Sequence, residues 1–125
     1  MHLLISIRPK YAEQIFSGDK KFEYRKTRFK RDFERAVVYA SSPIKSLIGE
    51  FAVDDIIEDT PENLWEQTKA FGCISRTEFF RYFANCNLAV AIKIGQVTRY
   101  PKPIDPRERY GQDFTPPQSF FYKED

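Results

Sequence analysis

Residues 6–25 read SIRPKYAEQIFSGDKKFEYR, and this stretch decides the fold prediction. Residues 3–8, which lead into this stretch, alternate between two sets of side chains. One set is apolar throughout and the other becomes polar towards residue 8, which is the period of a strand with one buried face. Pro9 suits a first helical turn and Gly18 suits a helix end. The sequence therefore predicts a strand followed by a short helix over residues 9–17.

A second strand is predicted from Lys20 to Lys26, where the period of two returns. Phe22 and Tyr24 lie on one side, and the charged side chains Lys21, Glu23 and Arg25 lie on the other. If this strand neighbours the first one, its charged face meets the polar end of that strand, at Ser6 and Arg8.

That meeting point is the most informative candidate site. A guanidinium beside a carboxylate and a lysine can hold a phosphate or read a base edge, because Arg donates in a plane and Glu accepts from an exocyclic amine. We therefore predict ligand-binding roles for Ser6, Arg8, Lys20, Glu23 and Arg25. The alternative interpretation is a solvated strand face with surface ion pairs.

The rest of the chain predicts further short elements. Strands are expected over 36–40, 46–57, 88–97 and 119–122, with a bulge or bend at Gly95. Helices are expected to start after Thr60 and after the capping box Ser75–Glu78. The prolines at 101, 103, 106, 116 and 117 are expected to leave a long loop before the last strand.

Short strands, about three short helices and no βαβ spacing indicate an α+β fold built on a small mixed β-barrel. The 125 residues suit one domain, 1–125, with a single core rich in aromatic side chains.

The net charge of +2 hides an asymmetry along the chain. Residues 8–31 hold nine basic and three acidic residues, whereas residues 46–68 hold seven carboxylates and no Lys or Arg. Opposite faces of the domain are therefore expected to differ in sign.

Several classes of protein are disfavoured by composition. No apolar run approaches the length of a membrane span, so a cytoplasmic protein without a membrane partner is expected. One histidine, His2, and two cysteines without ligand spacing, Cys73 and Cys86, argue against disulfide scaffolds, metal sites and catalytic triads. No cofactor is predicted.

A basic run, residues 25–35, is interleaved with Phe29 and Phe33, a combination typical of surfaces that track phosphates and stack bases. Arg28, Lys30 and Arg31 are predicted to hold nucleic-acid phosphates. The alternative interpretation, given the same weight, is a solvated loop that binds no nucleic acid and has Phe33 packed into the core.

Two further segments offer ligand contacts. Ser41 and Ser42 follow a buried strand, and Gln118 lies in the proline-rich segment before the last strand. All three are candidates for the ligand pocket, although a turn at Ser41 and Ser42 and a rigid surface loop around Gln118 are the simpler explanations.

The quoted stretch resembles the opening of ASCH domains, with their G-x-K-x-x-E-x-R motif present as Gly18, Lys20, Glu23 and Arg25. The similarity continues through most of the chain. The residues involved are 39–43, 48–51, 74–75, 91–95 and 117–120. The resemblance implies a PUA-like β-barrel with a cleft between barrel and helices, in a family associated with RNA metabolism and, for some members, with predicted transcription regulation.

Two enzymatic activities occur among proteins that this chain resembles. An N4-acetylcytidine amidohydrolase uses a lysine, a threonine and a glutamate; Lys20 matches the lysine, but Glu23 replaces the threonine, and residues 70–72 lack the glutamate, the nearest being Glu66. Ribonuclease-like cleavage needs only charge stabilisation and a general acid or base, which Lys20, Glu23 and Arg25 can supply as catalytic residues.

The leading hypothesis is an RNA- or nucleotide-binding module, with DNA as a further possible partner. An enzyme, either a metal-independent ribonuclease or a hydrolase of a modified nucleoside, is the alternative, and a protein-interaction domain is the third. Sequence does not decide whether the site is catalytic, because the same triplet binds a nucleotide without chemistry.

Overall fold

Six strands and four short helices follow one another along the chain, and the computed structural model describes all residues from 1 to 125. The elements are β1 (His2–Ile7), α1 (Pro9–Phe16), β2 (Phe22–Arg25), β3 (Arg35–Ala40), β4 (Ser46–Asp59), α2 (Pro61–Thr68), α3 (Arg76–Tyr82), β5 (Ala89–Ile104), α4 (Pro106–Tyr110) and β6 (Phe120–Lys123). None of the helices is long and apolar enough to cross a membrane.

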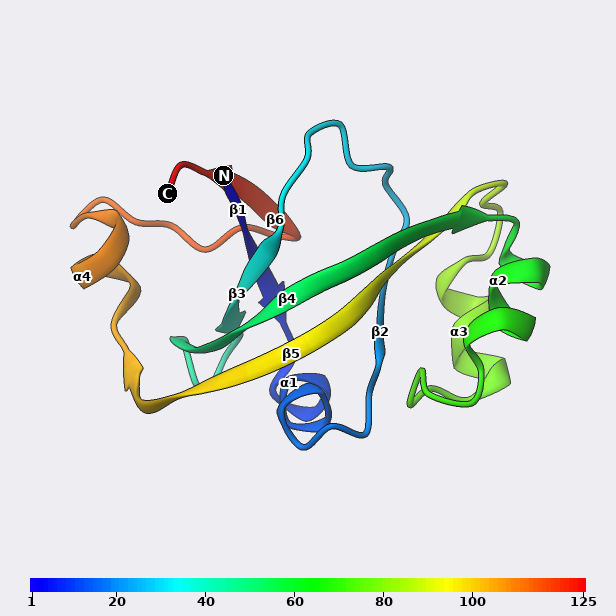
Figure 1. Ribbon diagram of the computed structural model, residues 1–125, viewed down its shortest axis with the longest axis horizontal. Coiled ribbons are helices and arrows are strands. Elements are labelled where there is room, and N and C mark those ends of the chain that lie inside the picture. The colour runs from blue at the N-terminus through cyan, green and yellow to red at the C-terminus, as the bar shows by residue number, and fades with distance from the viewer.

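All six strands belong to one mixed sheet in the order β2-β5-β4-β3-β1-β6. β1 is parallel to β3, and every other neighbouring pair is antiparallel. The long strands β4 and β5 run side by side across the molecule, with α2 and α3 at one end of them and α4 towards the other (Figure 1). This arrangement confirms the predicted α+β class.

The predicted helix starts are confirmed by their caps. The Thr60 side chain accepts a hydrogen bond from the Asn63 N–H and opens α2, and the Ser75 side chain does the same for the Glu78 N–H at the start of α3. α1 begins at Pro9, and Gly18, at φ 90°, follows its end in a conformation that side chains disfavour.

The last quarter of the chain differs from the prediction. β5 runs on to Ile104, so Pro101 and Pro103 lie inside a strand, and α4 follows where a loop was expected. Arg99 is opposite Gly49 and Ile104 is opposite Leu47, so the β5 residues between them bulge out of the pairing and the prolines displace no ladder hydrogen bond.

The bulge predicted at Gly95 is confirmed by the shift of register between Phe51 and Val53 of β4. A Cβ atom at Gly95 would collide with the Asp54 carboxylate and lie 3.2 Å from the Ala52 carbonyl, so a side chain here would displace the Asp54 side chain.

The core has three parts. The largest lies between α1 and one face of β1, β3, β4 and β5, and includes Leu3, Ile5 and Phe51. A second joins α2 and α3 to β2 and β5 around Leu64 and Phe79. Phe33 also joins the first cluster, packing edge-on against Phe29, so the packed alternative for Phe33 is the correct one.

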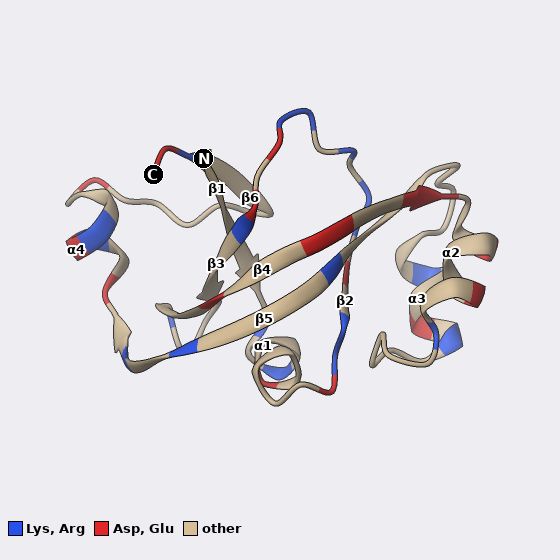
Figure 2. Cartoon of the chain, in the orientation of Figure 1, with Lys and Arg blue, Asp and Glu red and all other residues tan.

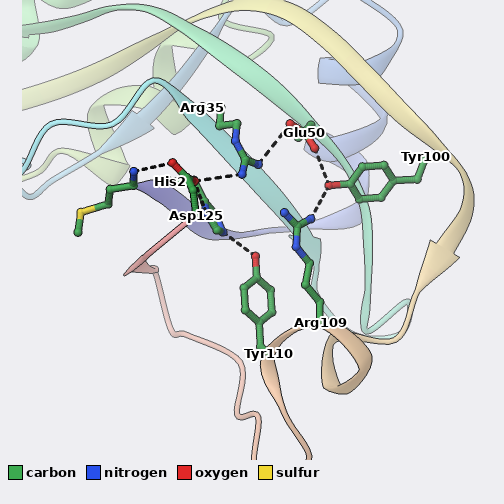
Figure 3. A network of polar contacts seen from close by, with 8 residues as sticks. His2, Arg35, Glu50, Tyr100, Arg109, Tyr110 and Asp125 are labelled. Atoms are coloured by element: carbon green, nitrogen blue, oxygen red, sulfur yellow. Dashed lines mark hydrogen bonds and ion pairs between the residues drawn. The ribbon is translucent and has the colours of Figure 1, made fainter.

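The third cluster corrects the prediction for the first strand. One buried face is expected for that strand, but Leu4, on the face opposite Leu3 and Ile5, is fully buried too, because Tyr110 and Phe114 of the C-terminal segment cover that side of β1 and β3. The same segment is tied down by a polar network (Figure 3). In it, the buried His2 ring contacts Tyr110 and Asp125, and Arg35 bridges Asp125 to Glu50.

The separation of the basic segment 8–31 and the acidic segment 46–68 onto opposite faces stays a prediction, although an ion pair joins the two segments. The loop between β2 and β3 is mainly basic and passes close to acidic positions of β4 (Figure 2). Arg28 forms an ion pair with Glu58 and Arg35 forms one with Glu50. Of the nine basic residues of 8–31, Arg28 alone pairs with a carboxylate of 46–68, and Arg35 adds a second pair from the start of β3.

Candidate functional site

A cavity of about 1090 Å³ opens between the ends of β1 and β2, helix α3 and the segment before β6. Every side chain proposed from sequence as a ligand contact lines it. These are Ser6, Arg8, Lys20, Glu23, Arg25, Ser41, Ser42 and Gln118. The structure therefore brings together residues from four separate parts of the chain.

Lys20 lies at the buried side of the cavity. The turn after α1 places it there, since its N–H donates to the Gln14 carbonyl, and its side chain is only 3% exposed. Its Nζ donates to the Gly72 carbonyl at 2.5 Å and lies about 5 Å from the ring centres of Tyr11 and Tyr24. Burial lowers the pKa of Lys20 below its usual value, and the nearby Glu23 carboxylate opposes that shift.

Glu23 and Arg25 form the centre of the cavity wall. Arg25 Nη2 donates to Glu23 Oε2 at 2.6 Å, and Glu23 Oε1 lies 3.9 Å from Lys20 Nζ. The three side chains are therefore a continuous chain of alternating charge, + − +, and none is more than 12% exposed. Of the charged face predicted for the second strand, Glu23 and Arg25 point into the cavity, whereas Lys21 is exposed and does not line it.

Arg25 also joins the two halves of the sheet. Its Nη2 donates to the Ser6 carbonyl and its Nη1 to Ser119 Oγ, each at 3.0 Å, while its Nε is buried without a partner. β1 and β2 are not neighbours in the sheet, so the condition under which their polar ends were expected to meet is not fulfilled. Their polar ends meet nevertheless, because the sheet curls until its β2 edge approaches β1.

The segment before β6 closes the site against β1. Ser6 Oγ donates to the Pro117 carbonyl at 2.7 Å, and the Ser6 N–H donates to the Ser119 carbonyl. These bonds leave Gln118 between two anchored residues with its side chain exposed towards the cavity mouth.

The remaining predicted contacts lie at the rim. Arg8 and Ser42 are exposed, and Ser41 is half-buried. The Ser41 N–H donates to the Ile7 carbonyl, which holds the turn beside the end of β1. Arg8 has no carboxylate partner, so its guanidinium is available to a ligand.

The predicted phosphate contacts Arg28, Lys30 and Arg31 do not line this cavity. Arg28 is paired with Glu58, Arg31 stacks over the Tyr122 ring, and all three are exposed. The loop that carries them leads away from the site after Lys26.

Sequence reasoning missed several lining residues. Tyr11 packs against the first core cluster, and its hydroxyl also reaches Glu78 across the cavity; burial raises the pKa of that tyrosine. Tyr24 and Tyr82 also line it. No local pattern marks these tyrosines, since an aromatic in an amphipathic stripe is read as core.

Further cations were missed as well. The complete cationic lining comprises Arg8, Lys10, Lys20, Arg25, Lys26, Lys45 and Arg81, against only the carboxylates Glu23 and Glu78. Glu66, the carboxylate considered from sequence, is exposed and paired with Lys69 outside the cavity. No cluster of three or more His, Cys, Asp or Glu side chains is placed to hold a metal ion.

This combination of groups suits an anionic ligand with an aromatic part. The excess of cations attracts phosphate, the tyrosine rings offer faces for stacking, and the Glu23–Arg25 pair presents an acceptor and planar donors together.

Comparison with known proteins assigns the chain to a family. The ASCH domain family matches residues 5–98, most of the chain and all of the Gly18–Arg25 motif. The chain belongs to the ASCH domain family. The ASCH resemblance expected from the sequence is therefore confirmed.

Relatives of this ASCH domain include proteins of very different length. An ASCH domain-containing ribonuclease of Zymomonas mobilis is 29% identical over 119 residues, covering 93% of this chain and 80% of the relative. A Ureaplasma parvum protein named ATP synthase subunit alpha is 32% identical over 104 residues, 82% of this chain but only 13% of that protein. The chain thus spans a small part of the latter relative.

Solved structures agree with the ASCH fold over the whole chain. The Zymomonas mobilis ASCH protein superposes with a TM-score of 0.89 at 27% identity, covering 98% of this chain and 87% of that one. A point variant of it gives a TM-score of 0.90 at 26% identity, covering 98% and 90%. The predicted PUA-like architecture is confirmed, with four short helices in place of about three.

Proposed function

We propose that the cavity of this ASCH domain binds single-stranded RNA, with a nucleotide held between the tyrosine rings and the Lys20–Glu23–Arg25 chain. The observation that carries the proposal is the ring of seven Lys and Arg side chains around one cavity that also holds a buried carboxylate. RNA is the polyanion that the family association and the ribonuclease-named relative favour.

Each group has a role suited to a nucleotide. Exposed cations at the rim, such as Arg8 and Lys10, attract the phosphates. The Tyr11 and Tyr82 rings offer stacking faces that any base can use. Glu23 and Arg25 read the base edge, because a carboxylate accepts from an amine and a guanidinium donates in its own plane.

Salt dependence tests the proposal directly. About three rim phosphate contacts on a single strand give a slope near −2 for log K against log salt, at about −0.7 per contact. We expect Arg8→Ala to weaken binding of a fluorescein-labelled 12-nucleotide RNA in anisotropy titrations and to flatten that slope by about 0.7. The matched control is Lys102→Ala, an exposed cation of β5 outside the cavity, which is expected to leave affinity nearly unchanged.

The proposal fails if wild-type affinity is independent of salt. Equal losses for Lys102→Ala and Arg8→Ala would also contradict it, since the cavity would then contribute no more than the general surface.

Cleavage of the bound RNA is the second candidate function, supported by the ribonuclease name of the Zymomonas mobilis relative. In this reaction the ribose 2′-hydroxyl gives its proton to Glu23 and attacks the adjacent phosphorus. Lys20 and Arg25 stabilise the charge of the phosphorane. The bond from phosphorus to the 5′-oxygen then breaks, and that oxygen takes a proton from water, which gives a 2′,3′-cyclic phosphate and a 5′-hydroxyl.

A cleavage assay separates the two functions. We expect cyclic-phosphate products from the same RNA in excess chelator, with the activity lost in Glu23→Gln and kept in Lys102→Ala. Intact RNA after long incubation at saturating protein would leave binding as the function. Hydrolysis of a modified nucleoside stays a weaker hypothesis, because Glu23 stands where that chemistry uses a threonine.

Other functions and a location expected from the sequence are part of this proposal. Binding of free nucleotides or DNA, a cytoplasmic location and a part in transcription regulation remain predictions. The same anisotropy titrations with DNA of matched sequence compare the affinities for RNA and DNA.

A further inference from the structure

A second hollow of about 540 Å³ adjoins the main cavity. Tyr39, Lys45 and Pro116 line both, so the two spaces meet at these three residues. The remaining walls of the second hollow come from the start of β4, the end of β5, α4 and Phe114. They are Ser46, Pro103, Asp105, Pro106, Arg107, Glu108 and Phe114.

Lys45 provides a positive charge where the main cavity and the second hollow meet. It is exposed, forms no ion pair with a carboxylate and sits in the turn between β3 and β4 at φ 53°. Its ammonium is thus unneutralised at the passage between the two spaces. A phosphate passing from one space to the other would meet this cation first.

The second hollow itself is nearly neutral in charge. Arg107 is held by Asp105 through two hydrogen bonds, at 2.8 and 3.2 Å, so its charge is already compensated. Four of its ten lining residues supply apolar rings, three prolines and Phe114, and the exposed Glu108 balances the charge of Lys45. The Phe114 ring packs 5.8 Å from Tyr39 and nearly parallel to Tyr110. A space without net charge that offers an aromatic ring and proline rings suits a base better than a phosphate.

The alternative exit from the main cavity is the basic loop. Arg28 there is paired with Glu58, and neither Lys30 nor Arg31 lines either space. The continuous path with a free cation at its junction therefore runs over Lys45 instead.

We infer that the ligand is a strand of at least two nucleotides, whose phosphodiester crosses Lys45 and whose next base enters the second hollow. This inference rests on the proposed function, since it adds a second base site to the nucleotide site in the main cavity. It makes chain length, rather than base identity alone, a determinant of affinity.

The test compares mono-, di- and trinucleotides that carry 2′-fluoro sugars, which prevent attack by a 2′-hydroxyl. Titrations with each of the four bases in the first position are expected to show at least about fivefold tighter binding on adding the second nucleotide, the low end for stacking of one base. Phe114→Ala should abolish that gain while mononucleotide binding persists. The matched control is Phe121→Ala, an exposed phenylalanine of β6 outside both spaces, which should keep the gain.

Photocrosslinking to the wild-type protein tests the inference independently if Phe114→Ala fails to fold. A dinucleotide with 4-thiouridine in the second position is expected to attach to residues 103–116 in peptide mapping. Attachment to residues 28–31, or a second nucleotide that adds no affinity, overturns the inference and leaves the nucleotide site intact. Absence of binding for every length overturns the proposed function as well.

Discussion

Replacing Glu23 with glutamine isolates the charge that holds the two buried cations of the cavity. Glu23 Oε2 accepts from Arg25 Nη2 at 2.6 Å, and its Oε1 lies 3.9 Å from Lys20 Nζ. Exposure of the three side chains is between 3% and 12%. Glutamine keeps the shape and one acceptor oxygen but leaves Lys20 and Arg25 without their counter-charge.

Removing one partner of a buried ion pair costs about 3–5 kcal/mol, and the retained amide oxygen puts the expected loss near 3 kcal/mol. An unfolding entropy of about 2.1 cal/mol/K per residue over the 125 residues converts this loss to a fall of about 11 °C in Tm. Urea unfolding followed by fluorescence of Trp65, the single tryptophan, measures the change in free energy of unfolding.

The control is Glu66→Gln on α2, which removes an exposed carboxylate from its pair with Lys69 and is expected to change stability very little. The reasoning is refuted if Glu23→Gln unfolds at the same urea concentration as Glu66→Gln. In that case the buried chain of charges would not need its central carboxylate.

Three further predictions concern stability. Tyr24→Phe removes the hydrogen bond to Thr68 Oγ1 at 2.7 Å and is expected to cost about 1 kcal/mol in urea unfolding; no change would mean that water replaces it. Ser75→Ala removes the cap of α3 and is expected to cost about 1 kcal/mol, with Ser75→Asp largely restoring it. Burial lowers the pKa of His2 below 6.5, so the unfolded chain takes the proton first and stability falls as pH drops through 6.5. The slope of unfolding free energy between pH 7 and 5 should shrink in His2→Gln, and an unchanged slope would contradict this.

Local features of the fold were predictable from sequence because neighbouring residues create them. The caps of α2 and α3 depend on one side chain and an N–H three residues later, at Thr60 and Ser75. The helix end at Gly18 and the bulge at Gly95 likewise follow from what a glycine permits.

Features that depend on distant partners were not predictable. Pro101 and Pro103 are tolerated in β5 only because the facing β4 register skips them. Leu4 is buried only because the C-terminal segment returns across β1. Neither partner is visible in the local pattern around these residues.

For the candidate site, sequence alone determined which kinds of side chain are present and which of them lie on the same face of a strand, because side chains of a strand alternate between its two faces. Tertiary structure decided which faces meet. Arg25 reaches Ser6 and Ser119 because the sheet curls and the last segment crosses its open side, and this closure also brings Tyr11 and Glu78 into the same cavity. The strand period specifies a direction for each side chain, whereas convergence on one space requires the long-range packing of the whole barrel.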